Sequence, residues 1–165
     1  MRLLSDFFAA TLDELCTFEP GKQPSLSMPM VWGRLVHADK LMELHDIVLG
    51  VWTPQTSFLY DGCLETLPGK VVVDERAVSI LTGVEDELVL SLCESMVEAL
   101  AEANLWQLAD YARKWWFEQD WKKVDMRRGD MCRLLIEIAH LARHAVSTGR
   151  DVYVWLCRWE RDEEE

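Results

Sequence analysis

Glu137, His140 and His144 are the residues whose types and spacing come closest to a metal-binding site. On a helix, at about 100° per residue, these three side chains share one narrow face. Two imidazole nitrogens and one carboxylate oxygen are donors that zinc or iron accepts. Arg133 lies on the same face and would repel a cation unless it turned away, and the spacing differs from that of HExxH proteases. A solvated polar face is therefore the favoured interpretation, and a metal-binding protein or enzyme that uses this face is an alternative.

The segment of residues 113–128 (RKWWFEQDWKKVDMRR) is the second candidate, because it places three tryptophans among six basic residues. Tryptophan and arginine are enriched at the centres of protein interfaces. The helical spacing predicts that Trp116 lies on the core-facing side of a helix, with Trp115 at the edge of that side. Trp121 and the basic residues after it are expected to be exposed.

A second flank of the same helix carries Trp106 and Phe117, which point in nearly the same direction. Either another element of the fold, which is the favoured alternative, or an outside partner must cover this flank. The residues predicted to bind a partner are Trp106, Phe117, Trp121, Lys122, Lys123, Arg127 and Arg128.

The net charge of −12 restricts the partners of the chain. An acidic surface repels phosphate backbones, so nucleic acid is an unlikely ligand and a protein partner of unknown identity is favoured. The sequence contains neither GxGxxG nor GxxxxGK(S/T) nor GxSxG, so no cofactor is expected and an enzyme is less favoured than a binding protein.

Several features predict a cytoplasmic protein without a membrane segment. No apolar run is long enough to cross a bilayer, and acidic residues make the first 16 residues a poor signal peptide. The five cysteines are odd in number, scattered and without a CxxC pair. Such a set predicts reduced thiols and argues against a disulfide framework or a thiolate zinc site.

The elements that position these residues can be predicted from periodicity. Aromatic and β-branched runs predict strands in residues 3–10, 30–37 and 151–159, and a weaker one in 70–73. Apolar residues at three- and four-residue steps predict helices. The predicted helices cover residues 12–17, 40–49, 74–83, 84–103, 105–116 and 131–148.

Capping residues support several of these helix boundaries. Thr11 with Glu14, and Asn104 with Gln107, have the spacing of a capping box, in which two side chains and two backbone amides bond reciprocally. Asp39 and Asp130 are predicted helix caps, and Gly50 and Gly149 are predicted helix stops.

These elements predict an α+β fold, mainly helical, in which about five or six helices pack on a small antiparallel sheet that includes the N- and C-terminal strands. Residues 1–165 are expected to form a single globular domain, with a frayed acidic tail at 160–165. The favoured function is a small acidic protein-binding module, for example an immunity-type or antitoxin-like inhibitor of a partner protein. An acidic DNA mimic, whose carboxylates replace phosphates, is a further alternative.

Overall fold

The computed structural model describes residues 2–11, 13–14, 30–34, 38–51, 78–84, 87–116 and 127–159. The strands in these ranges are β1 (Arg2–Ala10), β2 (Met30–Arg34), β3 (Val78–Val84), β4 (Glu87–Leu92) and β5 (Asp151–Trp159). The helices are α2 (Ala38–Val48), α3 (Glu94–Glu102), α4 (Leu105–Trp115) and α5 (Arg128–Thr148).

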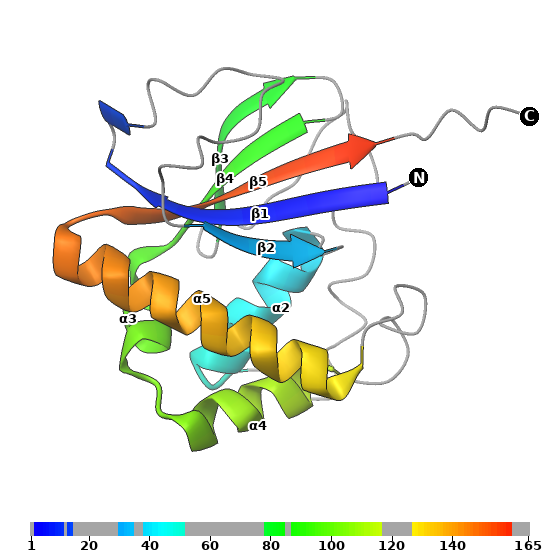
Figure 1. Ribbon diagram of the computed structural model, residues 1–165, viewed down its shortest axis with the longest axis vertical. Helices are drawn as coiled ribbons and strands as arrows, with labels where there is room; N and C mark the ends of the chain where they lie inside the picture. The colour runs from blue at the N-terminus through cyan, green and yellow to red at the C-terminus, as the bar shows by residue number, and fades with distance from the viewer. Residues whose placement is uncertain are drawn as a thin grey trace, which may run out of the picture.

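The strands form one antiparallel sheet with the order β2, β1, β5, β4, β3 (Figure 1). β1 and β5 pair along their whole length, from Arg2 opposite Trp159 to Ala10 opposite Asp151. Strands from opposite ends of the sequence are therefore neighbours, because each supplies the other with backbone hydrogen bonds. The predictions of an α+β fold and of an antiparallel sheet that includes both terminal strands are confirmed.

The prediction of five or six helices is corrected, because the described ranges contain four. β3 and β4 occupy residues for which the spacing predicts helices over 74–83 and 84–103. The sequence ELVLSL of β4 also has period two, and β4 pairs with β3 on one side and β5 on the other. These two ladders satisfy its backbone groups, so a strand forms where a short apolar run fits either period.

The core lies between the sheet and the four helices, which are on one side of it (Figure 1). Phe7 of β1 and Val154 of β5 face this layer and are fully buried. α5 contributes its predicted apolar stripe, which is confirmed in full. The buried residues of this stripe are Met131, Leu134, Leu135, Ile138, Leu141, Ala142 and Ala145.

α5 ends at the predicted glycine stop. Gly149 has a left-handed φ of 66°, and the amides of Gly149 and Arg150 both donate to the Ala145 carbonyl oxygen. This geometry satisfies a carbonyl that the last turn of a helix would otherwise leave without a partner. At the other end, Asp130 accepts from the Arg127 amide at 3.0 Å, so it caps the helix from inside the first turn.

The described side chains of β1 and β5 on the face of the sheet away from the helices are buried as well, apart from that of Asp151. Phe8 and Tyr153 are neighbours across β1 and β5, and their ring centroids lie 5.6 Å apart. Asp6 is 5% exposed and lies opposite Trp32 on β2 and Trp155 on β5. Asp6, Phe8, Tyr153 and Trp155 therefore share one face, because alternate residues of a strand and directly opposite residues point to the same side of a sheet.

Candidate interaction surface

The corner between α3 and α4 is built by two helix ends that meet within two residues. Asn104 caps α4 through the predicted capping box, in which its side chain accepts from the Gln107 amide and its own amide donates to the Gln107 side chain, both at 2.9 Å. This confirms the prediction for Asn104 and Gln107. The first turn of α4, with Leu105 and Trp106, is therefore held in a defined conformation.

Arg143 of α5 fastens the same corner from the other side. Its Nε donates to the Ala101 carbonyl oxygen at 2.9 Å, and its Nη2 donates to the Ala103 carbonyl oxygen at 2.8 Å. Both carbonyls lie at the end of α3, where no further helical amide can reach them. The planar guanidinium thus joins the end of α3 to α5 and closes the corner.

Leu105 and Trp106 present a small apolar surface at this corner, which we call the corner patch. Trp106 is 86% exposed and Leu105 is 68% exposed. Among the residues whose side-chain exposure the structure describes, these are the most exposed of the large apolar side chains. An exposed tryptophan on a rigid helix is a typical anchor of a protein interface, because its large surface is buried with little loss of freedom.

The core-facing side of α4 differs from the predicted one. Leu108, Ala112 and Trp115 are buried, whereas Leu105 is exposed and Trp116 is half-buried. Trp115 occupies the core position because its Nε1 donates to the Lys40 carbonyl oxygen of α2 at 2.9 Å. The prediction that Trp115 lies at the edge is therefore wrong, whereas Trp116 packs against the core as predicted but is only partly buried.

Lys40 and Glu43 form an ion pair in the interior near this contact. The distance between Lys40 Nζ and Glu43 Oε2 is 3.1 Å, and the side chains are 8% and 1% exposed. On the same helix, His45 Nδ1 lies 2.9 Å from Asp46 Oδ1. The buried charges of Lys40 and Glu43 need each other as partners. Residue spacing alone does not predict that α2 buries this ion pair together with Leu41 and Leu44.

α3 presents an exposed row of carboxylates beside the corner patch. Glu94, Glu98 and Glu102 are exposed at four-residue spacing, so they share one side of the helix. Met96, Val97 and Leu100 are buried on the other side. We call Glu94, Glu98 and Glu102 the acidic row.

The cations near the end of α4 are balanced locally. Asp110 Oδ1 lies 2.8 Å from Arg113 Nη2, and Asp110 Oδ2 lies 3.0 Å from Lys114 Nζ. The hydrogen bond from Arg113, followed by that from Lys114, lowers the pKa of the Asp110 carboxyl below its ordinary value. Arg113 and Lys114 therefore share one counter-charge on their own helix.

The structure separates two parts of the predicted partner-binding set. Trp106 lies at the corner that Arg143 holds, whereas Arg127 and Arg128 are exposed at the start of α5. Arg128 is about 22 Å from Arg143 along the axis of the 21-residue helix, at 1.5 Å per residue. Phe117, Trp121, Lys122 and Lys123 lie outside the described residues.

The predicted metal ligands Glu137, His140 and His144 are exposed on α5. In the part of the chain that the structure describes, no three His, Cys, Asp or Glu residues form a group that could hold a metal ion. The His144 carbonyl oxygen accepts from the hydroxyls of Ser147 and Thr148, at 3.0 and 2.7 Å. The metal-binding and DNA-mimic alternatives stay predictions.

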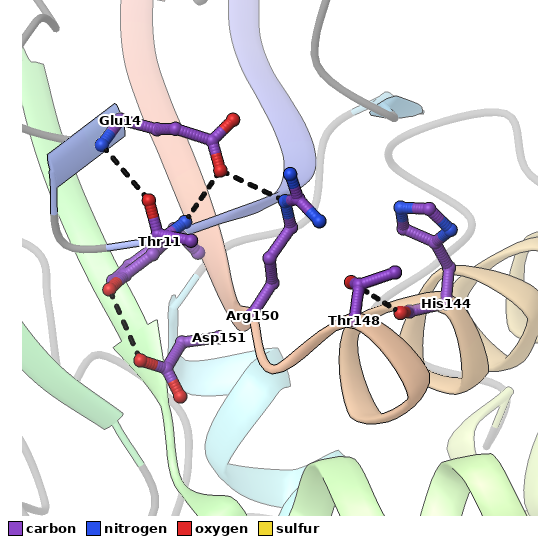
Figure 2. A network of polar contacts seen from close by, with 7 residues as sticks. Thr11, Glu14, His144, Thr148, Arg150 and Asp151 are labelled. Atoms are coloured by element: carbon purple, nitrogen blue, oxygen red, sulfur yellow. Dashed lines mark hydrogen bonds and ion pairs between the residues drawn. The ribbon is translucent and has the colours of Figure 1, made fainter.

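A second polar network ties the end of β1 to the start of β5 (Figure 2). The predicted capping box is present, since the Thr11 amide donates to Glu14 Oε1 at 3.0 Å and the Glu14 amide donates to Thr11 Oγ1 at 3.1 Å. Arg150 Nε also donates to Glu14 Oε1, at 2.9 Å. The Thr11 amide, followed by Arg150, lowers the pKa of the Glu14 carboxyl. These contacts join the end of β1 to the start of β5. Because the polar groups of this network bond to one another, the corner patch is the better candidate for binding a partner.

Among the described helices, none combines the length and apolar character that crossing a membrane requires. No protein-family model, curated protein or solved structure matches the chain.

Proposed function

We propose that this protein is a small protein-binding module and that it docks its partner through the corner patch. The observation that carries the proposal is the 86% exposure of Trp106, next to Leu105, on a helix turn fastened by a capping box. A large apolar surface on a rigid support loses little conformational entropy when it is covered. Trp121, Lys122, Lys123, Arg127 and Arg128 are proposed as a second contact region, and Phe117 is proposed to share the flank of Trp106.

An immunity-type or antitoxin-like inhibitor is the form of this function that we favour, because such a protein acts by covering a partner and needs no catalytic group. We place it in the cytoplasm, where thiols stay reduced. Cys93 and Cys132 are free thiols, which agrees with this placement.

The proposal is tested by affinity isolation from the native cell with matched variants. We expect a stoichiometric partner to remain with the wild-type protein and with Arg133→Ala, an exposed control on α5. Leu105→Ala/Trp106→Ala should lose it while keeping its far-ultraviolet circular dichroism spectrum. Equal recovery with the double variant and with the control would contradict docking through the corner patch.

A further inference from the structure

The acidic row leads directly into the corner patch. Glu102 ends α3, and only Ala103 and Asn104 separate it from Leu105. Arg143 binds the carbonyl oxygens of Ala101 and Ala103, so the end of α3 and the start of α4 are held as one unit. A partner that covers Trp106 must therefore also meet the electric field of the carboxylates at the end of this row.

Within the described ranges, none of the three carboxylates of the acidic row forms an ion pair. Arg143 donates to two neutral carbonyl oxygens and keeps its positive charge, so three carboxylates and one guanidinium leave a formal charge of −2 here. Arg113 and Lys114 are paired with Asp110 on α4. The chain as a whole carries −12, so no excess of positive charge elsewhere opposes this local negative potential.

We infer that the occupant of the corner patch is a protein surface on which lysine or arginine side chains surround an apolar pocket. This inference rests on the proposed function and specifies the chemistry of the partner. The indole of Trp106 fills the pocket, and Glu98 and Glu102 meet the basic rim. An acidic partner would bring like charges together at the rim, which opposes both the rate and the affinity of association.

Two amphipathic helical peptides test this chemistry with the full chain. Both have the same leucine face, and their other face carries either lysine or glutamate. We expect the leucine–lysine peptide to shift the indole N–H resonance of Trp106, assigned by its loss in Trp106→Phe, in a saturable manner. The leucine–glutamate peptide should leave this resonance in place.

A pair of double variants with equal charge change separates the acidic row from the general charge of the protein. Glu98→Gln/Glu102→Gln should bind the leucine–lysine peptide about fivefold more weakly than wild type at about 0.15 M salt, as expected for two exposed ion pairs. Asp13→Asn/Asp130→Asn removes two exposed carboxylates elsewhere, of which Asp130 lies about 20 Å from Arg143 along the axis of α5. It should bind within about twofold of wild type, because the Debye length at this ionic strength is about 8 Å.

Either of two results overturns the inference. One is a Trp106 resonance that responds to the leucine–glutamate peptide as strongly as to the leucine–lysine peptide, or to neither. The other is equal binding of the leucine–lysine peptide by the two double variants. In both cases the proposed function still stands if Leu105→Ala/Trp106→Ala loses the native partner and Arg133→Ala retains it. The proposed function itself is contradicted by a different result, namely that Leu105→Ala/Trp106→Ala still retains the native partner.

Discussion

Two tryptophans nine positions apart on α4 should respond in opposite ways to truncation. Trp115 is fully buried and its Nε1 donates to the Lys40 carbonyl oxygen, whereas Trp106 is 86% exposed. Trp115→Ala removes a core ring and a buried hydrogen bond, and we expect it to lower the free energy of unfolding by about 3–5 kcal/mol. Trp106→Ala removes a side chain that packs little, and we expect a change within about 0.5 kcal/mol.

Urea unfolding followed by far-ultraviolet circular dichroism measures both changes, because the helices dominate that signal. If Trp115→Ala does not fold, Trp115→Phe keeps most of the ring and should still lose about 1–2 kcal/mol, from the hydrogen bond and the smaller volume. Equal destabilisation by Trp106→Ala and Trp115→Ala would refute the assignment of Trp106 to the surface, and the corner patch with it.

Three further changes test the corners of the fold. The lowered pKa of Glu14 means that its bonds stabilise the fold fully above its ordinary pKa of 4.5 and lose this effect as the pH falls through the lower folded-state pKa. Glu14→Gln should therefore flatten the decrease in unfolding temperature below pH 4.5, and an unchanged acid profile would contradict the network. Arg143→Ala should lower the unfolding free energy by about 1–2 kcal/mol, through loss of two charge-assisted hydrogen bonds, and should speed amide exchange at residues 101–106; unchanged exchange would show that Arg143 does not hold the corner. Gly149→Ala should lower the unfolding free energy by about 1–2 kcal/mol because its φ of 66° is unfavourable for alanine; no atom crowds the new Cβ, so the backbone is the only cause. Gly129→Ala lies within α5, is equally open and should be neutral or stabilising. Similar melting temperatures for the two variants would contradict this reasoning.

Local signals in the sequence were sufficient where one element decides its own boundary. The capping boxes at Thr11 and Asn104, the stop at Gly149 and the apolar stripe of α5 each depend on residues within one or two turns. The pairing of residues 3–10 with 151–159 could also be predicted, because an isolated strand at either end has no other source of backbone partners.

The sequence could not determine features that depend on distant contacts. The run ELVLSL fits a strand as well as a helix, and the neighbouring strands β3 and β5 decide between them. Trp115 and Trp116 differ by about 100° around the helix axis, so a small rotation of α4 exchanges their places. Only the Lys40 carbonyl oxygen, contributed by α2, shows which indole is buried.

The candidate site was predictable only in part for the same reason. Trp106 is in the predicted partner-binding set, whereas Leu105 beside it is not, and the structure exposes both. Arg143 joins α5 to a corner 40 and 42 residues earlier in the chain, and no local motif indicates this contact. In the sequence, the acidic row has the pattern of an ordinary solvated helix face. Only its position beside Trp106 indicates which kind of partner surface it could bind.

Site-specific photocrosslinking in the native cell tests the central claim most directly. A benzophenone amino acid in place of the exposed Ala109, one turn from Leu105, leaves Trp106 intact and should form one defined covalent adduct with a partner protein. The same group at position 133 should form none. The adduct at position 109 should decrease in the Glu98→Gln/Glu102→Gln background and persist in the Asp13→Asn/Asp130→Asn background. An adduct of equal yield at positions 109 and 133, or none at position 109 while a partner is still isolated with the protein, would contradict docking at the corner patch.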